Sequence, residues 1–576
     1  MGLLNSALHI GRSALLSYQG ALQIVGNNVS SAGSADYTRL APDLAAMQGS
    51  LTTDNLQPGA GVALSGIQRY MDEALEDRVR LAIGANASAD AQQAATARIE
   101  PLFDSISGTD VATRLTEFFN SFDELQNTPD DVATRELALA AGARLSESLV
   151  ILRDQLTAVG ADFDGQIADL VNTADGLAQQ IGELNAEITA AEAGNRGQAT
   201  GLRDQRDALL RDLSDIFDVT VREQPNGALN VYIGSEALVQ GGFVRGLTAV
   251  EELDNGVPRT TARFADTNQQ VEVEGGRLAG LIQARDHYAY GEIGSLDQLA
   301  SAIIETVNSI HANGQGLNGF ASLTGANDLL AADVSLASSA SGLGSPVQSG
   351  SFFVTVVDDA TGTPVAYRID VEADGGDDDT TLESLAADIN EQVDGITASV
   401  TSDNRIMLAA DAGQRFVFGF DGQQARADTS HVLAALGLNT FFTGSDARDM
   451  AVNDELVNDP LLVAASTVMY AGEGSNAGQI AALDMVSIEA LEGMTMPAFY
   501  AALANSVAIT AAAANEGRET TSAVLSALQT QKESISGVNL DEEAISLLKY
   551  QRAYQGAARF VSVVNDLLDE LVLLVR

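Results

Sequence analysis

The chain has 576 residues, which is enough for several domains with separate cores. Apolar residues make up 45% and charged residues 19% of it, a composition typical of globular proteins. The formal net charge of −48 argues against nucleic acid and anionic membrane surfaces as partners, because phosphates must be met by Lys and Arg.

The sequence contains no cysteine, so neither a disulfide framework nor a thiol nucleophile is available. The first twenty residues lack a basic segment followed by an apolar core, so we expect no cleaved signal peptide of the Sec type. No apolar run approaches 18 residues, and we therefore also expect no membrane span.

The acidic charge is distributed unevenly along the chain. Residues 1–50 hold two basic and two acidic side chains, and residues 537–576 hold four basic and six acidic ones. The stretch between them carries the remaining −46. Many copies of the two ends could therefore crowd together while the middle of the chain stays solvated.

The N-terminal segment has the spacing of a heptad seam, in which apolar positions alternate at intervals of four and three residues. These positions are Leu4, Leu8, Gly11, Leu15, Tyr18, Leu22, Val25 and Val29. The spacing predicts a helix that pairs with other helices. It ends at a stretch rich in turn-forming residues, 27–37.

A second helix is predicted at the C-terminus, beginning at a capping box formed by Asn539 and Glu542. Its apolar positions are Leu547, Leu548, Tyr554, Ala558, Val561, Val564, Leu568, Leu571 and Val575. This stripe is wider than a strict seam. We therefore expect the helix to contact more than one neighbour.

Between the two ends, residues 145–191 continue a helical apolar pattern with one stutter, which predicts a helix about 70 Å long. Residues 218–240 alternate around a "PNG" turn and predict a β-hairpin. A further helix is predicted over roughly 276–312. Residues 351–430 hold sixteen acidic residues and four Arg in strand-like runs, with a short helix near 382–393, before helices resume after about 455.

The predicted fold class is multidomain α+β, in which both chain ends form a long coiled-coil-like helical bundle with inserted β-rich outer domains. We expect four parts. They are a terminal helical inner-core domain (1–35 with 538–576), a helical rod domain (36–217 with 276–315 and 446–537), a small β domain (218–275) and a β-rich acidic outer domain (316–445).

No constellation of catalytic residues is recognisable, and we expect neither an enzyme nor a cofactor nor a metal site. The four histidines are scattered, and His311 fits the C-terminus of a helix better than a metal site. The run "DGGDDD" from Asp374 to Asp379 has clustered carboxylates that suit Ca²⁺. It lacks a full twelve-residue loop, which favours a solvated acidic turn.

The stretch "NNVSSAGSADYTR" (27–39) resembles the N-terminal signature of bacterial flagellar axial proteins. Asn27, Asn28, Tyr37 and Arg39 match that signature, whereas Ser31, Ser34 and Asp36 depart from it. Residues 536–571 resemble the FlgK family of flagellar hook-associated proteins almost position by position. Segments at 202–216, 238–242, 275–286 and 307–319 are similar to that family in the same order.

The resemblance implies a structural protein at the junction between the flagellar hook and filament, outside the cell and exported without signal cleavage. Its implied partners are further copies of itself in a ring, the hook protein, a second junction protein and an export chaperone. Leu8, Leu15, Leu22 and Val25 would face Leu547, Tyr554, Val561 and Leu568 in the pairing of the two terminal helices. Tyr18, Val29, Ala558 and Leu571 complete the predicted pairing and subunit interface.

Comparing the burial of the eight apolar N-terminal side chains with the entropy of ordering them suggests that one partner helix is barely sufficient. We therefore hypothesise that the ends order only when several subunits surround them. Two other functions stay open. The first is an acidic secreted adhesin or surface-layer protein that binds calcium, and the second is an unrecognised hydrolase, which only the acidic clusters suggest.

Overall fold

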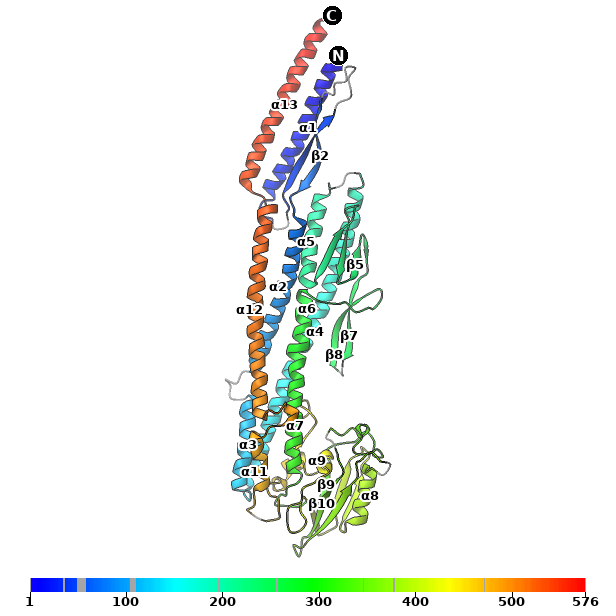
Figure 1. Ribbon diagram of the computed structural model, residues 1–576, viewed down its shortest axis with the longest axis vertical. Coiled ribbons are helices and arrows are strands. Elements are labelled where there is room, and N and C mark those ends of the chain that lie inside the picture. The colour runs from blue at the N-terminus through cyan, green and yellow to red at the C-terminus, as the bar shows by residue number, and fades with distance from the viewer. Residues whose placement is uncertain are drawn as a thin grey trace. The chain divides into compact units, whose positions relative to one another are not determined.

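Two units, each assembled from separate stretches of the chain, make up the fold. Unit 1 comprises residues 1–95, 161–284 and 512–576, and unit 2 comprises residues 96–160 and 285–511. The computed structural model describes residues 2–34, 37–48, 59–103, 110–194, 197–254, 257–344, 347–376, 379–470 and 472–574. Both chain ends belong to unit 1 (Figure 1).

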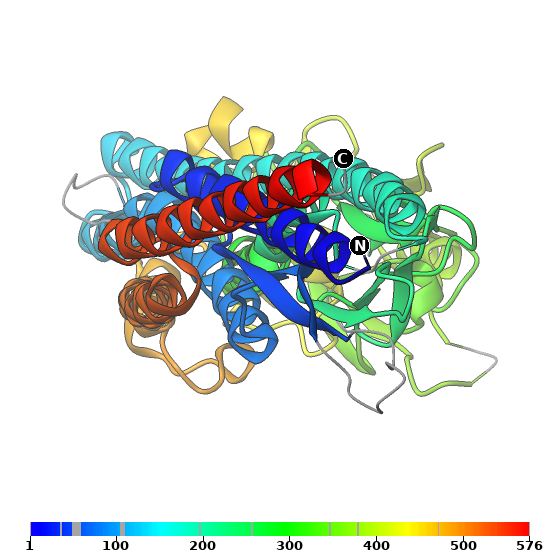
Figure 2. The ribbon, with the colours of Figure 1, turned by 90° about the horizontal axis from the view of Figure 1, so that it is seen from above.

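The two terminal helices of unit 1 pack against each other along the chain ends. Helix α1 (Gly2–Ser30) lies beside α13 (Leu540–Leu574) in both views (Figures 1 and 2). The antiparallel strands β1 (Leu40–Gln48) and β2 (Gly59–Arg69) pack on α1 as well. Helix α1 is therefore covered on more than one side.

This β1–β2 hairpin corrects the expectation of a helical first third of the chain. Its strands pair from Leu40 opposite Arg69 to Gln48 opposite Gly59, with two register shifts. The strands are rich in Ala and Gly and β1 carries Pro42, all residues of low strand propensity, and the bulges interrupt the alternation that marks a strand. The strand signal in the sequence was therefore weak.

The hairpin also accounts for a second difference from the sequence analysis. Both terminal helices are formed in the structure of a single chain, whereas we hypothesised that they order only on assembly. The comparison of apolar burial with ordering entropy counted only one partner helix for α1. The hairpin supplies additional buried contacts on a second face, such as the hydrogen bond of 2.9 Å from Ser17 Oγ to the carbonyl of Val62.

The rest of unit 1 combines long helices with two small antiparallel sheets. Apolar residues of α2 (Glu73–Ile99) form a cluster with Leu528 of α12 (Met496–Ser536). Helix α5 (Thr200–Ile216) contacts α6 (Gly276–Gln283). The sheets are β3 (Val219–Glu223), β4 (Leu229–Ile233), β5 (Glu236–Gln240) and β6 (Phe243–Val244) in that order, and the pair β7 (Leu247–Asp254) and β8 (Val257–Phe264).

Several predicted elements are confirmed in both units. Residues 145–191 lie within one continuous helix, α4 (Val132–Ala191), which passes from unit 2 into unit 1. The predicted hairpin at 218–240 corresponds to β3, β4 and β5. The helix expected at 276–312 is interrupted by a π-helical turn, Ala284–Ala289, where unit 1 ends and unit 2 begins; α7 (Tyr290–His311) follows.

Unit 2 contains an aromatic core around α3 (Val111–Asn127). Phe118 is fully buried, and its ring centroid lies 5.1–5.7 Å from those of Phe119, Phe122, Phe441 and Phe442. Unit 2 also contains several short helices and strands. They are η1 (Glu100–Phe103), α9 (Val432–Ala435), β15 (Phe442–Thr443), β16 (Ala451–Val452), α10 (Asp454–Asn458), η5 (Pro460–Leu462), α11 (Ser475–Ala482), η6 (Leu483–Met485) and η7 (Glu489–Leu491).

The strands and the short helix predicted within residues 351–430 are present in unit 2. Two three-stranded sheets have the orders β11-β10-β14 and β12-β13-β9. The predicted short helix is α8 (Leu382–Gln392), capped by Thr381 and Ser384 in a reciprocal capping box. The remaining elements are β9 (Ser322–Thr324), η4 (Ser339–Ser341), β10 (Gly350–Asp358), β11 (Pro364–Val371), β12 (Ile396–Val400), β13 (Ile406–Ala410) and β14 (Gln414–Phe418).

Candidate functional site

The terminal helix pair of unit 1 contains nearly all the predicted interface residues. On α1 the buried residues form a stripe slightly rotated from the predicted seam, because α13 and the hairpin share the helix between them. They are Gly11, Ser17, Ala21, Ile24, Val25 and Asn28. Of the predicted seam, Leu8, Leu15, Tyr18 and Leu22 are half-buried, and Val29 is exposed.

On α13 the covered residues follow a heptad-like spacing and face one side of the helix. They are Glu543, Ser546, Tyr550, Ala553, Ala557, Val561, Val564 and Leu568. Two of the predicted interface residues, Val561 and Leu568, belong to this stripe. The predicted residues Leu547, Tyr554 and Ala558 lie exposed beside it, and the side chain of Leu571 lies outside the described residues.

Helix α1 approaches α13 closely at Gly11. A Cβ atom at this position would collide with the side chain of Val561 and come within 3.2 Å of the ring of Phe560. Because glycine has no Cβ, the two helix backbones can approach closely here. Val561 therefore lies directly against α1.

A polar cluster, which we name the terminal clasp, joins the C-terminal end of α1 to the N-terminal end of α13. It consists of Asn28, Tyr37, Arg39, Glu542 and Glu543. The amide of Asn28 donates to the carbonyl of Leu40 at 2.8 Å and accepts from the backbone N–H of the same residue at 3.0 Å. This reciprocal pair ties the end of α1 to the start of β1.

The acidic side of the clasp comes from the first turn of α13. Glu543 is only 2% exposed, and it accepts hydrogen bonds from Arg39 Nε at 2.8 Å and Asn28 Nδ2 at 3.1 Å. Glu542 accepts from Arg39 Nη1 at 2.7 Å. Burial lowers the pKa of Arg39, but its hydrogen bonds and charge interactions with Glu542 and Glu543 outweigh this, so the net pKa is raised.

Tyr37 completes the clasp by donating from its hydroxyl to Asn28 Oδ1 at 2.8 Å. Burial and, to a smaller extent, the charges of Asp204 and Glu543 raise the pKa of Tyr37 to about 12, so the phenol keeps its proton. Asn27, the fourth signature residue, is exposed, and its carbonyl accepts from Ser30 and Ser31 at the end of α1. Three of the four signature side chains therefore converge on the start of α13.

The start of α13 is fixed by its own cap as well as by the clasp. The side chain of Asn539 accepts from the backbone N–H groups of Asp541 at 3.0 Å and Glu542 at 3.4 Å, as expected of an N-cap. The carboxylate of Glu542 pairs with Arg39, a partner that the predicted capping box did not include. Sequence reasoning missed Glu543, because its burial depends on contacts with Asn28 and Arg39 from the other end of the chain.

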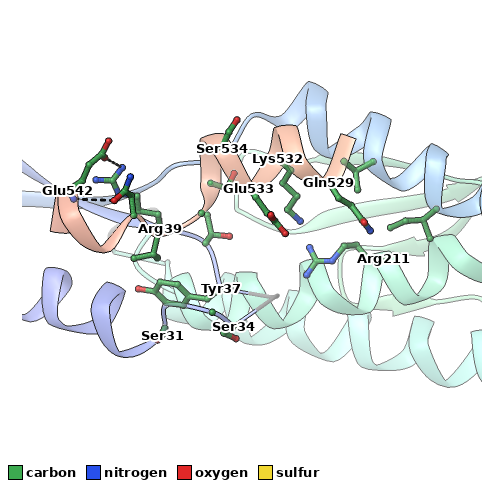
Figure 3. Close-up of a pocket in the computed structure, with 18 residues that line it drawn as sticks. Ser31, Ser34, Tyr37, Arg39, Arg211, Gln529, Lys532, Glu533, Ser534 and Glu542 are labelled. Atoms are coloured by element: carbon green, nitrogen blue, oxygen red, sulfur yellow. Dashed lines mark hydrogen bonds and ion pairs between the residues drawn. The ribbon is translucent and has the colours of Figure 1, made fainter. Parts of the chain in front are cut away.

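A cavity of about 930 Å³ opens beside the clasp. Figure 3 shows Ser34, Tyr37, Arg211, Lys532 and Glu542 around it, with the ion pair of Arg39 and Glu542 at one end. Lys532 is paired with Glu76 at 2.9 Å. The lining combines polar side chains of both charges with a few apolar ones such as Val79 and Ile83.

The two polar features singled out in unit 2 have structural roles. His311 is fully buried; its Nδ1 contacts the carbonyl of Asn439 at 2.7 Å, and its Nε2 accepts from the backbone N–H of Ala464 at 2.9 Å. Asp379 accepts from backbone N–H groups of its own turn, and Asp377 and Asp378 lie outside the described residues. No group of three metal-binding side chains occurs in the part of the chain that the structure describes.

Comparison with known proteins gives two family matches. The model of the flagellar hook-associated protein FlgK helical domain matches residues 96–327. The model of the C-terminal region of the flagellar basal body rod FlgEFG proteins matches residues 529–573, which contain α13 and the acidic side of the clasp. Both matches are therefore to models of flagellar proteins.

Relatives that match over nearly the full length of the chain are also flagellar proteins. Flagellar hook-associated protein 1 of Escherichia coli is 27% identical, with 99% of this chain and 100% of the relative covered. The protein of the same name from Bacillus subtilis is 23% identical, with 98% and 97% covered. The chain is therefore similar along nearly its whole length to flagellar hook-associated protein 1, and its middle part to the FlgK helical domain, the resemblance that the sequence predicted.

Among solved structures, the flagellar hook junction protein FlgK from Burkholderia pseudomallei matches with a TM-score of 0.49 and 16% identity, covering 80% of this chain and all of that one.

Proposed function

We propose that the protein is a structural, non-enzymatic component of the flagellum at the hook–filament junction, and that it assembles through its paired terminal helices. One observation carries this proposal: α13 exposes two rows of apolar side chains, of which the ring of Phe560 also lies beside Gly11 of α1. Exposed apolar surface of this extent marks an interaction site in a soluble protein.

The two rows flank the covered stripe of α13 on opposite sides, given about 100° of rotation per residue. Row A comprises Leu540, Leu547, Tyr554 and Ala558, and row B comprises Ile545, Phe560, Val563 and Leu567. The first three members of row A follow a strict seven-residue spacing, which is the spacing of a helix-pairing seam. Each α13 can therefore contact two further neighbours besides its own α1.

The exposed residues are large enough to drive association. Ile545 is 67% exposed and Phe560 is 43% exposed. Burying a side chain of this size fully contributes about 1.5–3 kcal/mol. Several such side chains on each row can offset the cost of associating two chains, and a ring of copies would bury both rows at once.

The partners and location follow from the family. We propose that further copies in a ring cover the two rows, and that the hook protein, a second junction protein and an export chaperone bind the chain at other stages. The protein would act outside the cell after export without signal cleavage. A coiled-coil-like bundle of both ends and the four-domain division made from the sequence belong to the same proposal.

Membrane insertion is a different way of covering apolar helices. The stretch Met496–Glu570 contains an 18-residue window apolar enough to cross a bilayer by composition, and 28% of that window is buried. One such stretch is weak evidence for a membrane span, because core helices of soluble proteins can be as long and as apolar. The heptad spacing of row A suits another helix better than lipid, and we keep further copies of the chain as its occupant.

Complementation of a deletion strain tests the proposal. The strain should form hooks without filaments, and the unaltered protein should restore swimming. Tyr554→Glu and Val563→Glu, one in each row, should fold but fail to restore swimming. Leu253→Glu is the matched control, because Leu253 is an isolated exposed apolar residue of β7, 76% exposed, and this variant should swim. Normal swimming of both row variants would contradict the proposal.

A further inference from the structure

The covered stripe of α13 does not by itself define one alignment of the terminal helices. Most of its members are small or aliphatic, including Ala553, Ala557, Val561 and Val564. They repeat at heptad-like intervals. A shift of α13 along α1 by two turns would place similar residues at similar positions. Apolar seams of this kind specify register weakly, and a buried polar residue commonly fixes it.

Glu543 is the one acidic residue in this covered stripe of α13. Its carboxylate accepts two hydrogen bonds from the N-terminal segment, one from Arg39 and one from Asn28, and it is almost fully buried. If α13 slid by one or two turns, Leu547 or Tyr550 would take its place. Neither side chain can neutralise Arg39, so the guanidinium would lose its buried partner, which is strongly unfavourable.

The donors of the clasp are held in place by bonds that do not involve the covered stripe of α13. Asn28 is fixed by its two hydrogen bonds with Leu40 and by the hydroxyl of Tyr37. The backbone N–H of Arg39 donates to the carbonyl of Ser536, the last residue of α12, at 3.0 Å. The N-terminal segment therefore presents a preformed receptor for one carboxylate.

We propose that Glu543 sets the axial register of α13 on α1, and that the signature residues Asn28, Tyr37 and Arg39 form its receptor. This assigns a positioning role to the signature that is distinct from contact with other copies. Glu543 would set this register within a single chain, whatever covers the exposed rows. The register nevertheless decides where each row lies along the helix pair.

Spin labels can measure the register directly, because the chain contains no cysteine and introduced thiols are the only labelling sites. Cysteines replace Gln19 on α1 and Gln555 on α13, both of which are exposed. The labelled full chain is diluted with unlabelled protein, so that pulsed electron paramagnetic resonance records only distances within one molecule. The unaltered clasp should give one narrow distance distribution.

Glu543→Leu should broaden this distribution or add a second distance, shifted on the order of 5–10 Å, one or two helical turns. Glu542→Gln is the matched control, because Glu542 also pairs with Arg39 but is exposed, and it should keep the single distance. A single unshifted distance in Glu543→Leu would overturn the proposal, since the apolar seam would then fix the register alone.

A second variant covers the case in which Glu543→Leu prevents α13 from folding. Replacing Arg39 by Met together with Glu543→Leu removes both buried charges, which should restore the helix pair. The proposal expects the restored pair to retain more than one distance. If the double variant returns to the single distance of the unaltered protein, the clasp merely stabilises the pair and the proposal fails.

Discussion

The terminal helix pair of unit 1 and the aromatic core of unit 2 differ in how completely they bury their apolar side chains. Phe118 in unit 2 is fully buried among four other phenylalanine rings, whereas Phe560 on α13 is 43% exposed. Unit 2 thus buries its aromatic core with residues of one chain. The terminal pair covers one stripe of α13 and leaves two rows open, which is the behaviour of a surface made for other molecules.

Buried polar groups differ between the two regions in the same sense. His311 in unit 2 is neutral, with both ring nitrogens occupied by backbone groups nearby in the fold. The terminal clasp instead pairs charges from residues about 500 positions apart, Arg39 with Glu542 and Glu543. A neutral network stabilises a core, whereas a charged pair drawn from both ends of the chain also specifies how those ends meet.

The largest expected effect comes from placing a charge inside the terminal pair. Leu22→Asp and Val561→Asp should leave the middle of the chain soluble and mostly folded while blocking assembly, because Val561 lies against Gly11 and an ionised carboxylate there has no partner. Motility of complemented cells and circular dichroism of the purified variants measure the two outcomes. Normal motility in either variant would show that the pair is dispensable.

The matching change in unit 2 should affect stability rather than assembly alone. Phe118→Ala removes a fully buried ring and should lower the free energy of unfolding of unit 2 by about 3–5 kcal/mol. Tyr554→Ser on α13 is the comparison, because its side chain is 37% exposed and should change stability by less than about 0.5 kcal/mol. Urea titrations that give equal losses for the two variants would remove the contrast between the regions.

The sequence predicted the long helices well and the clasp only in part. Strong apolar periodicity identified α1 and α4, and the resemblance drew attention to Asn28, Tyr37 and Arg39. The hairpin β1–β2 gave no such signal, because its strands are rich in Ala and Gly and contain bulges.

Glu543 could not be found from local patterns for a related reason. Next to Asp541 and Glu542 it looks like one of three solvated acids in a first helical turn. Its burial follows from contact with a segment about 500 residues away. The same long-range contact rotated the buried stripe of α1 away from the predicted seam, since the hairpin occupies part of the helix surface.

A pH titration should reveal the neutral histidine of unit 2. Burial is the main cause that lowers the pKa of His311 from 6.5 to about 4. Above pH 6.5 the residue is neutral in both states, and its contribution to stability is complete. As the pH falls from 6.5 to about 4, the imidazole is protonated in the unfolded chain but stays neutral in the folded chain. The free energy of unfolding therefore falls by roughly 3 kcal/mol.

The acidic residues titrate in the same range, so the measurement needs a variant. His311→Asn removes the imidazole and should lower stability at pH 7.5, because the contacts with Asn439 and Ala464 are disturbed. The difference in unfolding free energy between the two proteins should shrink as the pH approaches 4. A difference that stays constant from pH 7.5 to pH 4 would mean that His311 is not buried in its neutral form.

The smallest expected effect separates the cap of α13 from the clasp. Asn539→Ala removes the side-chain oxygen that accepts from Asp541 and Glu542, and should cost about 1 kcal/mol. Glu543 keeps its partners in this variant, so amide exchange should accelerate in the first turn of α13 and stay unchanged from Ala553 to Val564. Faster exchange along the whole helix would mean that the cap, and not the clasp, anchors α13 to the N-terminal segment.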